Sequence, residues 1–145
     1  MYVKAAAAAA PRIEAMLVES GTLSGHHRRC EALFGAAQAA LAGDARLLAA
    51  RVSELREALL GHFRYEEEHI FPLYEQASGA AGATEWLRAQ HDDMRGTLWM
   101  LGTVSAAADP QRYRTELVEL QAAFAAHAAD EESRMYPVFE RLLRG

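Results

Sequence analysis

Cysteine is almost absent from this chain. Cys30 is the single cysteine among 145 residues. One cysteine cannot form an intramolecular disulfide, a Cys-x-x-Cys redox pair or a metal site built from several thiolates. Any metal site must therefore be built from histidine and carboxylate side chains.

The sequence also lacks a cluster of positive charge and a long apolar run. Its formal net charge is -5, and no block of Lys or Arg offers an electrostatic footprint for nucleic acid or anionic lipid. The longest apolar run, Ala5–Ala10, is too short to span a bilayer and too weakly apolar for the core of a signal peptide. We therefore expect a cytoplasmic protein with neither a nucleic-acid nor a membrane partner.

Strand signals are missing as well. β-Branched residues are sparse, and no segment alternates apolar and polar residues over a sustained length. Alanine, leucine, glutamate and arginine dominate instead, and these residues favour helix. A chain of 145 residues is long enough to bury one substantial core. The sequence predicts a single all-α domain.

The N-terminal part of the chain is expected to be an arm over residues 1–20, ending at the turn signal Ser20-Gly21. The remainder, residues 21–145, is the predicted domain. Ser24 is expected to cap its first helix, because a serine oxygen accepts a hydrogen bond from a free amide of the first turn. That helix carries apolar residues at the three-and-four spacing of a buried stripe: Cys30, Leu33, Phe34, Ala37 and Leu41.

Three further helices are expected in the rest of the domain. Asp44 is expected to cap the second, which extends to near Gln76, and Thr84 is expected to cap the third. Asp109 followed by Pro110 is a typical start for the fourth helix, which runs to near residue 144. Short connections between four helices of comparable length favour an antiparallel up-down four-helix bundle.

One pattern of residues occurs twice. The stretch HFRYEEEHIFPLYE begins at His62, and HAADEESRMYPVFE begins at His127, 65 residues later. Each has a glutamate four residues after the histidine and an aromatic-Pro pair further on. A second pair of histidines, His27 and His91, lies 64 residues apart. The chain therefore predicts two helical hairpins of related design, each with one lone His and one His-x-x-x-Glu.

The repeated residues have the chemistry of a metal site. Residues four apart on a helix share one face, and the lone histidines lie among apolar residues, which directs all of these side chains into the bundle. Buried carboxylates without partners cost several kcal/mol each. A metal ion removes that cost, and two carboxylates able to bridge indicate two ions. The predicted metal ligands are His27, His62, Glu66, His91, His127 and Glu131.

A single His-x-x-x-Glu pair needs no metal to explain it, but two such pairs at matching positions are harder to explain without one. A single pair on a helix is usually a solvated pair on its surface. Here, each copy is followed by an interior proline, Pro72 or Pro137, at the same distance from its histidine. Because a proline inside a helix costs about 3 kcal/mol and kinks it, two equivalent prolines indicate two hairpins built alike.

Four phrases, HRRCEALF, HFRYEEEHIFPLY, AQHDDMR and HAADEESRMYPVF, resemble the four helices of the hemerythrin-like family, the HHE cation-binding domains. The resemblance covers about residues 20–145. It implies a non-haem di-iron centre with the four histidines as terminal ligands and with Glu66 and Glu131 as bridges. The implied cofactor is two iron ions with an oxo or hydroxo bridge, and manganese or zinc are the alternatives. Ferritin-like bundles use Glu-x-x-His, which this chain lacks.

The sequence departs from the oxygen-carrying members of the family, which have His-x-x-x-His on the third helix and an Asp on the fourth. Here Arg95 follows His91 by four residues, and the fourth-helix acid is Glu131. Of about twelve coordination positions on two octahedral irons, roughly ten are filled. The rest can take two external ligands or one more protein ligand. His69, seven residues after His62, is the candidate for that additional ligand, although its counterpart Arg134 cannot ligate.

Three residues next to the predicted ligands are expected to lie outside the set of ligands. Glu67 and Glu132 are expected to be solvated or to contact the ligands from outside, and Glu67 could replace Glu66 if the helix were rotated. His26 is expected to be partly exposed, because adjacent helical residues point about 100° apart.

The resemblance implies binding of dioxygen, peroxide or nitric oxide for sensing or detoxification, with or without turnover. Alternatives within the family are reversible oxygen carriage and iron donation or repair for iron-sulfur proteins. From a different class, the metal could be structural, and the bundle could be an interaction module. In that case the arm would contact a protein partner or a second copy of the chain.

Overall fold

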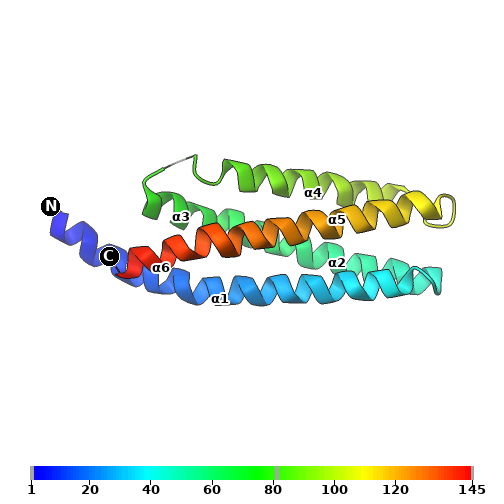
Figure 1. Cartoon of the computed structure of the whole chain (residues 1–145), viewed down its shortest axis with the longest axis horizontal. Coiled ribbons are helices and arrows are strands. Elements are labelled where there is room, and N and C mark those ends of the chain that lie inside the picture. The colour runs from blue at the N-terminus through cyan, green and yellow to red at the C-terminus, as the bar shows by residue number, and fades with distance from the viewer. Residues whose placement is uncertain (1, 81, 145) are drawn as a thin grey trace.

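The computed structural model describes the backbone of residues 2–80 and 82–144 and the side chains of residues 21–80, 82–139 and 141. Within these ranges the chain is helical and has no strand. It forms an antiparallel up-down four-helix bundle (Figure 1). The elements in chain order are α1 (Tyr2–Ala40), α2 (Ala45–Tyr65), η1 (Glu66–Ile70), α3 (Phe71–Ser78), α4 (Glu85–Thr103), α5 (Pro110–Asp130), η2 (Glu131–Met135) and α6 (Tyr136–Arg144).

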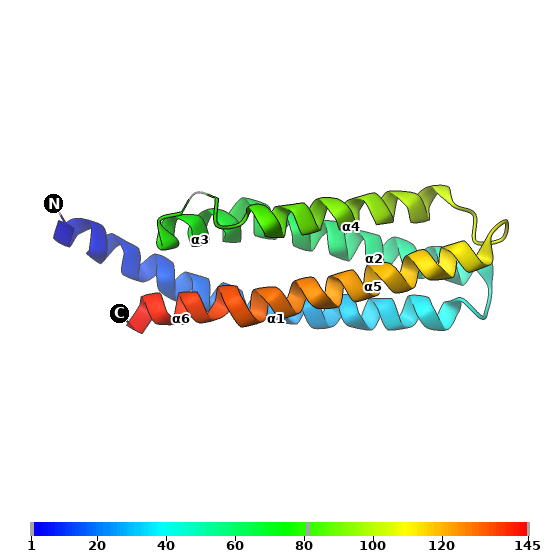
Figure 2. The ribbon, with the colours of Figure 1, turned by 45° about the horizontal axis from the view of Figure 1, so that its top comes forward.

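The four long segments form two hairpins. Helix α1 packs on α2, and α4 packs on α5, while α1 also contacts α5 and α6 and closes the bundle (Figure 2). Both ends of the chain lie at one end of the bundle, opposite the two hairpin connections that follow α1 and α4. None of the described helices is both long and apolar enough to cross a membrane.

Two of the expected helix starts are confirmed. The Asp44 side chain accepts a hydrogen bond from the amide of Arg46, and Asp109 accepts one from the amide of Arg112. Thr84 does precede α4, but the expectation that its side chain caps the helix is wrong. Its hydroxyl donates instead to the Glu75 carboxylate, which ties the start of α4 to α3.

The first helix begins earlier than the sequence predicts. Helix α1 continues through Ser20-Gly21 and Ser24 without interruption, so the expected turn and cap at these positions are wrong. A glycine inside a helix costs only about 0.5–1 kcal/mol, and the surrounding alanine-rich sequence favours helix. The predicted arm is therefore the first part of α1.

Both interior prolines are accommodated by a π-helical turn. In the second segment, the Phe71 amide bonds to the carbonyl of Glu66, and in the fourth the Tyr136 amide bonds to that of Glu131. Each bond spans five residues instead of four, which identifies the π turn. Because a proline has no amide hydrogen and crowds the carbonyl four residues back, the wider turn ahead of Pro72 and Pro137 relieves that conflict.

The bundle interior has two apolar clusters with a polar layer between them. On α1, Leu23 belongs to the smaller cluster and Cys30 to the larger, and His27 lies between them. On α4, His91 lies in the same way between Leu87 and Met94. The smaller cluster also contains Ile70, Phe71, Met135 and Phe139 from the segments that follow the two glutamates. The predicted ligands thus lie in one layer that is covered by apolar packing on both sides.

We expect Leu55→Ala to lower the free energy of unfolding by about 2–5 kcal/mol, because Leu55 is fully buried in the larger cluster. Urea unfolding followed by circular dichroism measures the change. The control is Leu47→Ala on the same helix, where the side chain is 45% exposed and the expected change is below about 0.5 kcal/mol. Equal losses in the two variants would contradict this assignment of the core.

Candidate metal centre

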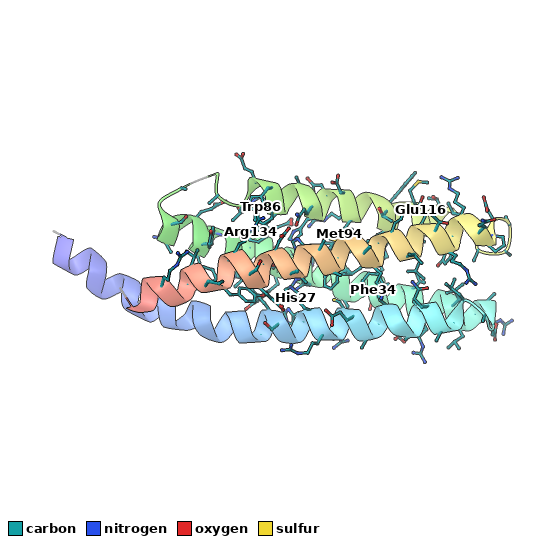
Figure 3. All side chains as sticks on the ribbon, viewed as in Figure 1. His27, Phe34, Trp86, Met94, Glu116 and Arg134 are labelled. Carbon is teal, nitrogen blue, oxygen red and sulfur yellow. The ribbon has the colours of Figure 1, made fainter. Side chains whose placement is uncertain are left out.

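The structure brings the six predicted ligand side chains together in the polar layer. Nitrogen and oxygen atoms of one group, His27, His62, Glu66 and Glu131, all lie within 4.8 Å of one another. A second group, Glu66, His91 and His127, meets the same limit. Glu66 belongs to both groups. Figure 3 shows labelled His27 and Met94 near the middle of the bundle, away from its loops.

Each carboxylate is contacted by a histidine of its own helical segment. His62 Nε2 lies 2.9 Å from Glu66 Oε1, and His127 Nε2 lies 2.7 Å from Glu131 Oε1. These short contacts follow from the four-residue spacing, which places both side chains one turn apart on the inner face.

Each carboxylate is also contacted from the other hairpin. Glu66 Oε1 lies 3.3 Å from His91 Nε2 and 3.5 Å from His127 Nε2, and Glu131 Oε1 lies 3.2 Å from His27 Nε2. The two glutamates therefore connect the hairpins, and each of the four predicted histidine ligands presents Nε2 to a carboxylate.

Several buried polar atoms of this layer have no hydrogen-bond partner. Glu66 and Glu131 are both 0% exposed, and their Oε2 atoms are unpaired. His62 Nε2 also makes no hydrogen bond, although it lies 2.9 Å from Glu66 Oε1. No Lys or Arg among the described side chains contacts either carboxylate. Unpaired buried oxygens facing imidazole nitrogens fit the donor set of a bound cation.

The outward nitrogen of each histidine has its own partner. Such outer contacts fix the ring and its tautomer, so that the inward nitrogen keeps its lone pair for a metal. The Nδ1 contacts are His27 to Glu132 Oε1 at 3.1 Å, His91 to Glu67 Oε2 at 3.3 Å, His127 to Gln90 Oε1 at 2.7 Å and His62 to His26 Nδ1 at 3.2 Å.

The family model for the Hemerythrin HHE cation binding domain matches residues 19–139. The chain belongs to this family. No curated protein and no solved structure matches it. Membership in the HHE family, together with the cluster of histidine and glutamate side chains, makes this a hemerythrin-like protein with a site able to hold metal.

The electrostatics of this HHE site favour the protonation states that bind metal. Burial raises the pKa of Glu66, but the close contacts of its carboxylate with the His127, His62 and His91 rings outweigh burial and hold that pKa well below its ordinary value. Burial lowers the pKa of His62 and His127, so both rings are neutral at pH 7. An ionised carboxylate and neutral imidazoles are the forms that bind a metal ion.

His69 lies outside the HHE site. Its side chain is 61% exposed, and its nearest acidic partner is Glu68 at 3.9 Å. The candidate for an additional ligand therefore points away from the other ligands, because the π turn η1 lies between it and His62. In α-helix, seven residues complete nearly two turns, but a π turn rotates less per residue and moves His69 off that face.

For the residues next to the HHE ligands, some contacts agree with the expectations from sequence and others do not. Glu67 binds His91 from outside and does not replace Glu66. His26 is partly exposed, as expected, but it also contacts His62. The contact of Gln90 with His127 is missed by the sequence analysis. Its signal is the 64-residue offset, which places Gln90 opposite His26.

A small hollow leads from the surface to one side of the cluster. It has a volume of about 210 Å³, lies between α1 and α2, and is lined by His26, Arg29, Cys30, Glu57, Ala58, Gly61 and His62. Burial raises the pKa of the Cys30 thiol to about 12, so the thiol stays protonated. Cys30 is therefore a small apolar wall of the hollow, as its place in the core predicts.

We expect the metal-free protein to lose stability as the pH falls below about 6.5. The folded-state pKa values of His62 and His127 lie below 6.5, the value of an ordinary histidine. Below 6.5 the unfolded chain therefore binds protons that the folded site does not, and acid favours unfolding. Glu66, with its lowered pKa, acts in the same direction at lower pH.

Urea unfolding of chelator-treated protein at a series of pH values measures this dependence. A His62→Gln, His127→Gln double variant is the comparison, because it removes both titrating groups from the folded and unfolded chain. The stability of the double variant should fall less steeply between about pH 6.5 and pH 5.5, the range in which histidine titrates. A metal-free protein that becomes more stable over this range would contradict the assignment.

Proposed function

We propose that this HHE protein holds two iron ions and uses them to bind dioxygen, peroxide or nitric oxide in sensing or detoxification. The observation that carries the proposal is the pair of donor groups that share Glu66, with both buried carboxylates leaving one oxygen unpaired. Two imidazole pairs on either side of two carboxylates supply a place for two ions rather than one.

The donor set suits iron. Imidazole and carboxylate ligands are typical of iron, manganese and zinc sites, and the described residues offer no thiolate ligand in either group. When bound, a pair of iron ions would supply electrons and open coordination positions for a small molecule. The chain would contribute His27, His62, His91 and His127 as terminal donors and Glu66 as a donor shared by both groups. We propose that Glu131, whose Oε1 lies 2.7 Å from His127 Nε2, is shared as well.

Three features of the chain support small-ligand binding over a closed structural site. Two histidines and one or two carboxylates per ion leave octahedral positions free, whereas structural sites are saturated by protein ligands. The apolar clusters on both sides of the layer keep bulk water out. The hollow between α1 and α2 gives a molecule of a few atoms a route towards His62.

The first experiment compares the metal content of the wild-type protein with that of a His62→Ala, His127→Ala double variant by plasma mass spectrometry. We expect about two irons per wild-type chain and a loss of most of this iron in the variant, because each substitution removes a terminal donor. His69→Ala is the matched control and should retain the wild-type iron content, because His69 is exposed and lies outside the cluster.

The second step tests the ligand. The iron-loaded, reduced protein is exposed separately to dioxygen, peroxide and nitric oxide, and its optical spectrum is followed. A spectral change with at least one of them is the expected result. One zinc per chain, or no response to any of the three molecules, would contradict the proposed function.

A second candidate function is self-association through the start of α1. In both ribbon views the first turns of this helix extend beyond the ends of the other helices (Figures 1 and 2). A helix without tertiary packing is only marginally stable in water, so pairing with a second copy of the chain would stabilise this segment.

Removal of residues 1–18 tests the second candidate, because the family match begins at residue 19. If the start of α1 mediates association, light scattering after size-exclusion chromatography should show dimers of the full chain and monomers of the shortened one. Iron content should stay the same in both. An unchanged mass per particle would rule out this role for the segment.

A further inference from the structure

The outer contacts divide the site into two unequal halves. We call His91 and His127 the His91 half, and His27 and His62 the His27 half. The lone histidine of each half donates from Nδ1 to a glutamate of the opposite hairpin, His91 to Glu67 and His27 to Glu132. These two glutamates follow Glu66 and Glu131 at matching positions of the repeat. Their own surroundings differ.

In the His91 half, the outer glutamate is held in place. Arg95 Nη2 lies 2.7 Å from Oε1 and 2.6 Å from Oε2 of Glu67, and Arg95 Nη1 donates to Asp92 at 3.1 Å. In the His27 half, Glu132 is 44% exposed and contacts no arginine or lysine among the described side chains. Its contact with His27 therefore has no second support.

The other histidine of each half shows the same difference. His127 Nδ1 donates to Gln90 Oε1 at 2.7 Å, and Gln90 Nε2 in turn donates to Asp130 at 3.3 Å. An amide oxygen is a permanent acceptor, so this contact fixes the tautomer of His127. His62 Nδ1 meets instead the ring nitrogen of the half-buried His26 at 3.2 Å, where one ring must donate and the other accept.

The sequence repeat shows the origin of this difference. With the 64-residue offset, Gln90 corresponds to His26, and Arg95 corresponds to the exposed Glu31. One turn after the lone histidine, the two hairpins thus carry opposite charges. Arg95 binds the outer glutamate of its half, whereas the glutamate at the matching position offers Glu132 no positive charge.

We propose that the two metal positions are unequal, and that the position in the His91 half fills first and holds its ion more tightly. This inference rests on the proposed two-metal site. Outer partners that orient a ligand histidine and raise its basicity change metal affinity by roughly 10- to 100-fold when removed. The His91 half has Glu67, Arg95 and Gln90 in these roles. The position in the His27 half exchanges its ion more readily.

The test uses Zn²⁺ alone with the metal-free full chain, because Zn²⁺ is diamagnetic and allows the histidine rings to be followed by NMR. With the first equivalent of Zn²⁺, the resonances of His91 and His127 should shift before those of His27 and His62. Calorimetry of the same titration should resolve two binding steps whose affinities differ by about tenfold or more.

Matched variants assign the two steps to the two halves. Glu67→Gln should weaken the tight step by roughly 10- to 100-fold, and Glu132→Gln should leave that step unchanged. Arg95→Gln, which leaves the glutamate in place, should weaken the tight step as well. Glu31→Arg is designed to supply a positively charged partner for Glu132. It should strengthen the weak Zn²⁺ binding step and so reduce the difference in affinity between the two steps. Far-UV circular dichroism of each variant controls for folding.

The outcomes separate this inference from the proposed function. Two equal Zn²⁺ steps, or shifts of His27 and His62 first, would overturn the inference and leave the two-metal site intact. A tight step that is insensitive to Glu67→Gln and Arg95→Gln would overturn it too. Binding of fewer than two Zn²⁺ per chain would contradict the two-metal proposal itself, and the inference with it.

Discussion

The burial of two carboxyl groups at the centre of an apolar bundle is the constraint that orders the rest of this structure. Glu66 and Glu131 are fully buried, and each keeps an oxygen without a hydrogen-bond partner. Charges in such a place are tolerated only with partners of good geometry. Four imidazoles are those partners in the metal-free chain. A bound cation would be a stronger partner, and the unpaired carboxylate oxygens indicate a place for one.

The same constraint explains the arrangement along the bundle. Every long segment carries apolar residues above and below its contribution to the polar layer, so the site is covered without any insertion into the fold. The π turns begin at the two glutamates and end just before the aromatic-Pro pairs. They let each segment deliver a carboxylate to the layer and still accept a proline one turn later.

Much of this site could be predicted from sequence because helical periodicity determines which side chains share a face. His62 with Glu66, and His127 with Glu131, follow from a four-residue spacing. Two features could not be predicted in this way. The π turn changes the rotation per residue and removes His69 from the inner face, and local propensity in α1 overrides the turn signal at Ser20-Gly21. The family match over residues 19–139 agrees with the resemblance of the four helices.

The outer contacts were harder to predict, because they join residues far apart in sequence and on different helices. His27 and Glu132 are separated by 105 positions, and only the assembled bundle brings them together. Because of this separation, the outer residues can differ between the two hairpins. Each inward histidine must reach at least one of the same two carboxylates, which keeps the repeat similar at the centre. One layer out, Arg95 and Glu31 occupy matching positions with opposite charge, so the two pairs of repeated histidines have unequal support.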